Sequence, residues 1–203
     1  MRKRPQQKRS QALVSKLIDA AAEVIVERGL PFTTTNHIAE RAGVDIASLY
    51  QYFENKEDLI EELLKRLSSE MIDIANQYFG SIEMYQATPA ELIRGALSLG
   101  LSIARQKPAV LELAQHPGVF FSSHGIVKLE TYLQEVATAY FTHHFRSYPI
   151  TNLQTRLHIV SRSAITLLAR HLADDAQPHI NDVEFVEAMV ALYGPYFEHH
   201  PTA

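Results

Sequence analysis

Apolar residues recur every three or four positions over almost the whole chain. The first such stretch places Leu13, Leu17 and Ala21 on one face, as an amphipathic helix requires. It ends at Arg28-Gly29, a cation followed by a glycine, which is typical of a helix C-terminus. Runs that alternate apolar and polar residues between turn signals are missing from the sequence. The pattern therefore predicts an all-α protein.

Between residues 33 and 64 the sequence predicts short helices separated by tight turns. Thr34, Asp45 and Asn55 each have a side-chain oxygen that can accept a hydrogen bond from the free amides of a following helix. Gly43 separates the first two of these helices. We expect the first to end at Ala42.

Longer helices should follow, giving about nine in all. Thr88-Pro89 supplies a cap and a proline at the first helical position, and Pro108 closes or kinks that helix. Gly194-Pro195 should kink the last helix near its end. The ranges expected after residue 55 are 56–79, 89–107, 109–115, 123–147, 152–174 and 182–199.

Composition limits the kind of protein. The chain has 203 residues, 46% of them hydrophobic, and no Cys, so it can bury a core but cannot form a disulfide, a thiolate metal site or a cysteine nucleophile. No stretch approaches the roughly 18 uninterrupted apolar residues of a membrane helix. The basic start is followed by Lys16 and Asp19 instead of an apolar signal segment. We expect a soluble, cytoplasmic protein.

The positive charge is concentrated at the N-terminus. Six of the 19 Lys and Arg residues precede Asp19, which is the first acidic residue. A basic arm over residues 1–9 on an acidic body suggests contact with a polyanion. A solubilising tail is the alternative, and the charge pattern does not decide between them.

The spacing Ala39, Gly43, Val44 and Leu49 is what two steeply crossing helices need: a small residue at the crossing, a residue that tolerates positive φ in the turn, and apolar anchors. It predicts a helix-turn-helix whose second helix, 46–52, enters the DNA major groove. Ordinary tight packing is the alternative.

Side chains around that second helix suit DNA. Hydroxyl and ammonium groups that can donate to phosphate oxygens belong to Thr34, Tyr50, Tyr52 and Lys56. The outward residues of the helix are Asp45, Ile46, Ala47, Ser48, Gln51 and Tyr52. Gln51 can hydrogen-bond a base edge, whereas Ile46 and Ala47 can contact only a thymine methyl group.

Longer strings in this region resemble the N-terminal domain of TetR-family transcriptional regulators. The resemblance covers about residues 10–64 and is carried by LIDAAA from Leu17, TTTNHIAERAGV from Thr33 and SLYQYFENKEDL from Ser48. It implies an all-helical homodimer with a DNA-binding domain at 10–60 and an effector-binding and dimerisation domain at 61–203. Asp45 and Ala47 depart from the commoner Ser and Gly, and Asp45 could lower affinity or narrow the choice of operator.

By the same resemblance, Thr34 caps a helix near a phosphate and Tyr50, Tyr52 and Lys56 hold the DNA backbone. The residues that would face bases are Ile46, Ala47, Ser48 and Gln51. Most such regulators are repressors that a small effector releases from a pseudo-palindromic operator.

The last two long helices, 152–174 and 182–199, are apolar on two sides. Helices of this kind need two burial partners, and we expect a second subunit to be one of them. The middle helices should hold a small apolar or aromatic effector. Candidate residues, each of which could instead be plain core, are Met84, Tyr85, His116, Phe120, Phe121, His124, Tyr132, Phe141 and His144.

Other functions find less support. No two of the 10 histidines are three or four residues apart, and the pairs Glu112/His116 and His171/Asp175 lack a third ligand, so we expect no metal site. Nucleotide-binding and nucleophile motifs are missing as well, which predicts neither a cofactor nor enzymatic activity. The alternative to a ligand-responsive regulator is an architectural or partner-recruiting DNA-binding dimer without an effector.

Overall fold

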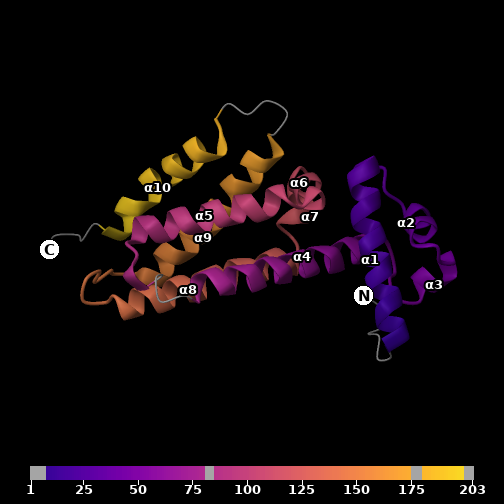
Figure 1. The fold of residues 1–203 in the computed structure, drawn as a ribbon, viewed down its shortest axis with the longest axis horizontal. Helices are drawn as coiled ribbons and strands as arrows, with labels where there is room; N and C mark the ends of the chain where they lie inside the picture. The colour runs from indigo at the N-terminus through magenta and orange to yellow at the C-terminus, as the bar shows by residue number, and fades with distance from the viewer. Residues whose placement is uncertain (1–7, 81–84, 175–179, 199–203) are drawn as a thin grey trace. The chain divides into compact units, whose positions relative to one another are not determined.

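The computed structural model describes residues 8–80, 85–174 and 180–198. All regular secondary structure in these residues is helical, which confirms the predicted fold class (Figure 1). The ten helices are α1 Lys8–Arg28, α2 Thr35–Ala42, α3 Ile46–Tyr50, α4 Lys56–Phe79, α5 Pro89–Arg105, α6 Pro108–Ala114, α7 Pro117–Phe120, α8 His124–His143, α9 Leu153–Ala173 and α10 Asp182–Glu198.

The chain forms two compact units. The N-terminal unit consists of Met1–Ser69 and Lys107–Val127, and the C-terminal unit of Glu70–Gln106 and Lys128–Ala203. Two helices, α4 and α8, run through both units. The predicted domains 10–60 and 61–203 are a functional division that these units do not test.

Helix boundaries in the N-terminal unit follow from local capping. α1 ends at Arg28, and Gly29 has a φ of 80°, the left-handed conformation expected of a terminal glycine. The Thr34 side chain accepts a 3.2 Å hydrogen bond from the His37 amide, and the Asn55 Oδ1 accepts a 2.8 Å bond from the Asp58 amide. Both predicted caps are confirmed.

The predicted Asp45 cap is wrong. Asp45 occupies the N-cap position of α3, but within the described residues its side chain makes no capping hydrogen bond. Lys8 and Arg9, the last two residues of the predicted arm, begin α1. Residues 1–7 lie outside the described part of the chain.

The core of the N-terminal unit joins α1 to α2, α3 and α4 (Figure 1). Leu17 and Ile25 of α1, Ile38 of α2, Leu49 of α3 and Leu59 of α4 are all fully buried. The Arg66 guanidinium of α4 also lies 2.7 Å from the Asp19 carboxylate of α1. This packing fixes α2 and α3 on the α1–α4 pair.

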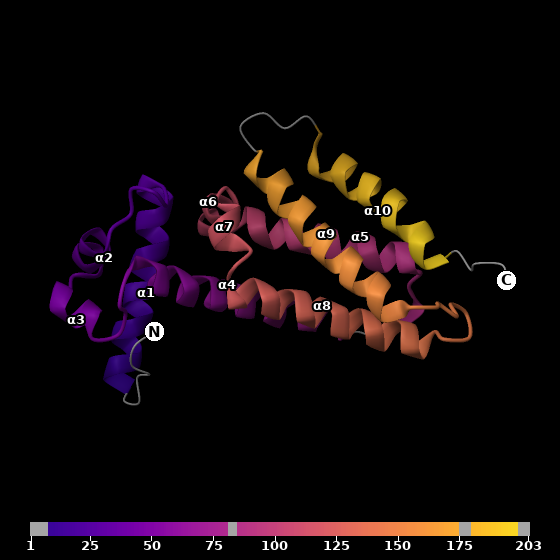
Figure 2. The same ribbon diagram turned by 180° about the vertical axis from the view of Figure 1, so that it is seen from behind.

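In the C-terminal unit, α5, α9 and α10 pack together (Figure 2). α5 begins with the predicted cap: Thr88 and Glu91 exchange hydrogen bonds in a capping box. Asp182 at the start of α10 accepts bonds from Arg105 of α5 at 2.9 Å and lies 2.8 Å from the His171 Nε2 of α9. The Arg105 guanidinium is the main reason that the pKa of the Asp182 carboxyl lies below its usual value.

One missing helix and two predicted boundaries need correction. α7 was not predicted, because Pro117-Gly118 is a common turn sequence; it raises the number of helices in the described residues from about nine to ten. α3 ends at Tyr50 instead of residue 52, and α8 ends at His143 instead of residue 147, since residues 144–147 form turns. Pro195 lies inside α10, which continues to Glu198.

None of the helices in the described ranges has a stretch long and apolar enough to cross a bilayer.

Candidate functional site

The turn between α2 and α3 has the geometry that the sequence predicted. Gly43 has a φ of 60° and a ψ of 42°, a conformation that an L-residue with a Cβ adopts only with strain. The Val44 amide donates to the Ala39 carbonyl at 3.0 Å and the Gly43 amide to the Glu40 carbonyl at 2.9 Å. These bonds close the end of α2 and turn the chain directly into α3.

The outer side of α3 is open to solvent. Asp45, Ala47, Tyr50 and Gln51 are exposed, while Ile46 and Ser48 are half-buried. Their roles in DNA contact remain predictions. Tyr52 differs, because it is only 8% exposed, so the prediction that it faces outward is wrong. The Tyr52 ring packs in the core instead of lying on the surface.

Tyr50 has a neighbour that the sequence did not reveal. Its phenolic oxygen lies 3.0 Å from the Thr35 Oγ1 at the start of α2. The Thr34 hydroxyl beside it is occupied as the α2 cap. Residues 34, 35 and 50 thus place three hydroxyl groups on the α2–α3 pair. No periodicity signals a contact between residues 15 positions apart.

Lys56 is tied to the turn between α1 and α2. Its Nζ donates to the Leu30 carbonyl at 3.1 Å, and the Leu30 amide donates to the Glu112 Oε1 of α6 at 2.9 Å. Both backbone polar groups of Leu30 therefore bond to side chains of other helices. An ammonium group has three donors, so Lys56 could also bind a phosphate.

The cations near this surface are not equally available. Arg41 of α2 pairs with Glu23 at 3.0 Å and with Glu27, both on α1. This hydrogen bond to Arg41 lowers the pKa of the Glu27 carboxyl. Lys16 of α1 is exposed, and its Nζ would lie 3.8 Å from a Cβ added to Gly43. Lys16, which lies beside the helix-turn-helix, is a residue that the sequence analysis did not assign to DNA contact.

The sequence profile of bacterial regulatory proteins of the tetR family matches residues 17–63, which contain the α2–α3 pair. The solved structure of the transcriptional regulator FadR from Bacillus subtilis, in complex with stearoyl-CoA, superposes with a TM-score of 0.67 at 18% identity, covering 92% of this chain and 99% of that one. The N-terminal part of this chain, residues 17–63, is therefore a TetR-type helix-turn-helix domain. The predicted resemblance is thereby confirmed.

Curated relatives match over short stretches of the chain. An uncharacterised HTH-type transcriptional regulator, YvkB of Bacillus subtilis, is 39% identical over 67 residues, which is 33% of this chain and 35% of that protein. The HTH-type transcriptional repressor KstR2 of Rhodococcus jostii is 43% identical over 51 residues, 25% of either chain. The chain thus matches about a quarter to a third of the length of these curated relatives.

The residues predicted to bind an effector are distributed over both units. His116, Phe120 and Phe121 belong to the N-terminal unit, while Tyr85, Tyr132, Phe141 and His144 belong to the C-terminal unit. Met84 lies outside the described residues. Phe141 packs in a core cluster against Phe197, and the His144 ring lies 4.6 Å from that of Tyr140. Their contact with an effector remains a prediction.

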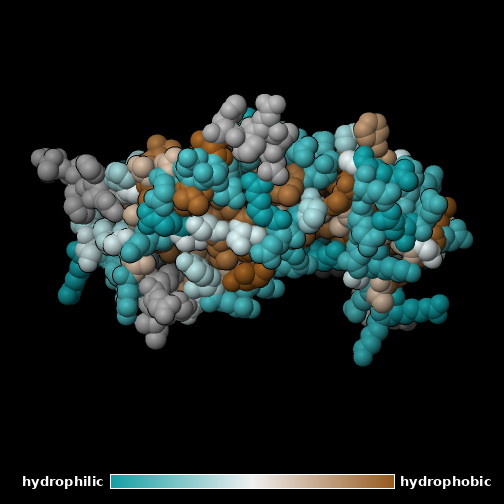
Figure 3. All heavy atoms as spheres, turned by 45° about the horizontal axis from the view of Figure 1, so that its top comes forward, coloured by the Kyte–Doolittle hydropathy of each residue, from teal (hydrophilic) through white to brown (hydrophobic). Residues whose placement is uncertain are grey.

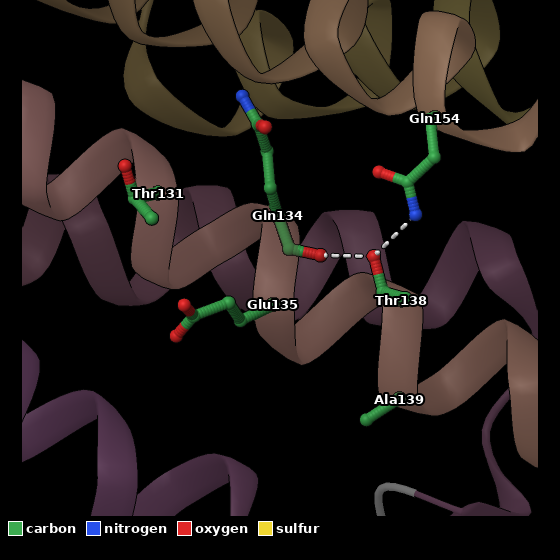
Figure 4. A pocket seen from close by; sticks show the side chains of 6 residues that line it. All are labelled: Thr131, Gln134, Glu135, Thr138, Ala139 and Gln154. Atoms are coloured by element: carbon green, nitrogen blue, oxygen red, sulfur yellow. Dashed lines mark hydrogen bonds between the residues drawn. The ribbon is translucent and has the colours of Figure 1, made fainter.

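A hollow of 460 Å³ lies on α8 and α9 (Figure 4). Thr138 donates to the Gln134 carbonyl at 2.7 Å and accepts a 3.4 Å bond from Gln154. The hollow is lined by Thr131, Gln134, Glu135, Thr138, Ala139 and Gln154. None of these is a predicted effector residue. The Thr138 hydroxyl and the Gln154 amide are thus engaged with each other, and the Gln134 Nε2 donates to the Ser161 Oγ at 2.8 Å.

The pairs weighed as metal ligands have other roles. The His116 Nε2 lies 3.3 Å from Glu112, whose carboxylate also holds the Leu30 amide. His171 pairs with Asp182, while Asp175 lies outside the described residues. Within the described residues, no three His, Asp or Glu side chains are grouped as a metal ion would require. His124, named as a polar effector candidate, bonds Glu61 at 3.0 Å and is largely exposed.

Proposed function

We propose that this protein is a sequence-specific DNA-binding regulator of transcription. The observation that carries the proposal is the α2–Gly43–α3 turn, which leaves Asp45, Ala47, Tyr50 and Gln51 exposed on one short helix. Such a helix can enter a major groove. There, Gln51 would read a base edge, whereas the hydroxyls of Thr34 and Tyr50 would hold phosphates.

A dimer would present two such helices to a pseudo-palindrome. α9 exposes Ile159 and Leu167, and α10 exposes Val183, Leu192 and Tyr196, by 38% to 72% of their surface. Figure 3 shows hydrophobic residues at the surface over the C-terminal helices, among hydrophilic ones. Burial of these side chains against a second copy is favourable, which supports a homodimer formed by α9 and α10.

Release by a small effector is the mode of regulation we propose, with repression as the output. α4 begins next to the DNA-binding helices and ends in the C-terminal unit, so a ligand that changes its position changes the spacing of the two recognition helices. The dimer would then have two arrangements, one with the spacing that fits DNA and one without it. A ligand shifts the equilibrium between them only by the difference in its affinity for the two arrangements.

Selection of bound duplexes from a random DNA pool tests the proposal. We expect a two-fold symmetric consensus with half-sites about one helical turn, or a multiple of it, apart. Gln51→Ala should lose about 1–3 kcal/mol at one base pair of each half-site and keep the other preferences. A pool without a consensus at any salt concentration would refute sequence-specific reading and favour an architectural DNA-binding dimer.

A further inference from the structure

An apolar cluster at the meeting of α4, α5 and α8 in the C-terminal unit is incompletely covered. Ala75 and Phe79 of α4 are its buried members. The side chains packed against them are only partly buried: Leu92, Ala96, Leu99, Tyr132 and Val136. Most side chains of the cluster therefore keep some apolar surface exposed, which an apolar molecule could cover.

The cluster contains one polar side-chain atom, the phenolic oxygen of Tyr132. This atom is buried and has no hydrogen-bond partner in the part of the chain that the structure describes. Burial raises the pKa of the Tyr132 phenol, so the hydroxyl keeps its proton at neutral pH. Buried hydroxyl groups almost always have a partner, because an unmet one is destabilising.

Two other buried tyrosines of the same unit do have partners. The Tyr193 hydroxyl donates to the Ser163 Oγ at 2.7 Å, and the Tyr140 hydroxyl donates to the Ala87 carbonyl. The protein thus satisfies buried phenols where its own chain can do so. Tyr132, in the incompletely covered cluster, is the one of these three tyrosines whose hydroxyl has no partner among the described residues.

We propose that this cluster binds an apolar molecule with an uncharged carbonyl oxygen, which accepts a hydrogen bond from the Tyr132 hydroxyl. The inference rests on the proposed small-molecule effector and names its chemical class. A phenol is a good hydrogen-bond donor. A carbonyl oxygen is an acceptor, and its transfer from water costs little free energy when it is hydrogen-bonded in the site. A carboxylate fits less well, because the members of the cluster carry no positive charge that could pair with it.

The test uses the full chain and three probes in equilibrium dialysis. Methyl decanoate has an apolar chain and an uncharged carbonyl, decanoate replaces the ester by a carboxylate, and methyl acetate keeps the ester without the chain. We expect methyl decanoate to bind at least tenfold more tightly than either of the others. Equal binding of decanoate, or no binding of methyl decanoate, would overturn the proposal.

Tyr132→Phe separates a ligand contact from a structural role. We expect it to weaken methyl decanoate binding about tenfold, the effect of leaving a buried carbonyl unpaired. Without ligand it should unfold at the same temperature as the wild type or at a higher one, since no internal hydrogen bond is lost. The matched control is Tyr148→Phe, a half-buried tyrosine of the other apolar cluster, and it should leave binding unchanged.

Two results would contradict the role of Tyr132: unchanged ester binding by Tyr132→Phe, or a lower unfolding temperature of the unliganded variant.

Selection of bound DNA by the same preparations keeps the two proposals apart. A wild-type protein that selects a palindrome but binds no ester refutes only this inference. One that binds the ester through Tyr132 but selects no DNA consensus supports the site and refutes the regulator.

Discussion

At the scale of single residues, the hydroxyl groups of Thr35 and Tyr50 form a pair, and the number of their protons limits which of them can donate to DNA. Two hydroxyls that share one hydrogen bond, here 3.0 Å long, leave one proton for a third group. A phenol is more acidic than an aliphatic alcohol and is therefore the better donor to a DNA phosphate. We infer that Thr35 donates to Tyr50, which leaves the phenolic proton for the phosphate. Bonds in such a chain strengthen one another. Thr35 is then a positioning residue for Tyr50.

Tyr50→Phe and Thr35→Val should each weaken operator binding by about 1 kcal/mol, which is roughly fivefold. The slope of log affinity against log salt concentration should stay unchanged, because neither substitution removes a charge that displaces counterions. Titrations of a selected operator at 50–200 mM KCl measure both quantities.

Thr142→Val is the matched control for this pair. Its hydroxyl bonds the Thr138 carbonyl within α8 at 2.7 Å, so operator affinity should not change. An altered salt slope in Thr35→Val, or an equal loss in Thr142→Val, would contradict the assigned role.

At the scale of helices, the start of α8 approaches α4 so closely that only glycine fits. A Cβ on Gly125 would lie 2.7 Å from the Leu64 carbonyl oxygen and 2.9 Å from the Lys65 amide nitrogen. These are backbone atoms inside α4, which cannot turn away as the end of a side chain can. The glycine therefore sets the distance between the two helices.

Gly125→Ala should destabilise the protein by about 1–3 kcal/mol through overpacking. Gly118→Ala, in α7, is the matched control: nothing lies within 4 Å of its added Cβ, so the helix propensity of alanine should leave stability unchanged or slightly raised. Urea unfolding of both variants measures the difference. Similar midpoints for the two variants would show that α8 moves away from α4 at little cost.

The N-terminus of α10 should make stability depend on pH. The pKa of the Asp182 carboxyl is lowered, mainly by the Arg105 hydrogen bond and further by the His171 hydrogen bond, which together outweigh the opposite effect of burial. Such a carboxyl stabilises the fold above its ordinary pKa of about 3.9 and loses this contribution as pH falls through its lower value in the folded protein.

Asp182→Asn should therefore lower stability near pH 7, by about 0.5–1 kcal/mol because the pair is partly exposed. The difference from wild type should shrink as pH falls below the ordinary Asp pKa of about 3.9. Asp174→Asn, at the exposed end of α9, is the control and should leave the unfolding midpoint near pH 7 close to that of the wild type. Unfolding midpoints recorded from pH 2 to 7 decide this, and a constant difference across that range would argue against the ion pair.

Sequence predicted the helices well wherever their ends are set by neighbouring residues. The caps at Thr34, Asn55 and Thr88 and the stop at Gly29 depend on contacts within four positions. The pairing of Thr35 with Tyr50 and of Leu30 with Glu112 depends on packing between distant segments, which no local pattern encodes. Tyr52 was misplaced for the same reason: its burial is decided by the core that it joins.

At the scale of the whole molecule, composition selected aromatic effector candidates but could not group them. Phe120 packs in the N-terminal unit beside Phe121, whereas Phe141 fills a core cluster of the other unit. Tyr132 and His144 each have a buried polar atom without a hydrogen-bond partner among the described residues, and Tyr132 is the one that belongs to the incompletely covered cluster. Aromatic content indicated the class of residue, and hydrogen-bond accounting indicated which one to test.

At the same scale, binding of the proposed operator should depend on assembly of the proposed dimer. Leu192 of α10 and Ile159 of α9 are 60% and 50% exposed, and a glutamate at either position would place a charge in the proposed interface. Leu192→Glu and Ile159→Glu should give monomers in sedimentation equilibrium. Operator affinity should fall at least a hundredfold, because the two half-sites no longer bind as one linked unit.

Phe145→Glu is the control, since Phe145 is 66% exposed in the segment between α8 and α9 and lies outside the proposed interface. It should remain dimeric with unchanged affinity for DNA. Dimeric Leu192→Glu and Ile159→Glu variants would move the interface away from α9 and α10. Monomers that keep full operator affinity would instead separate DNA binding from assembly, because a single helix-turn-helix would then supply the whole binding energy.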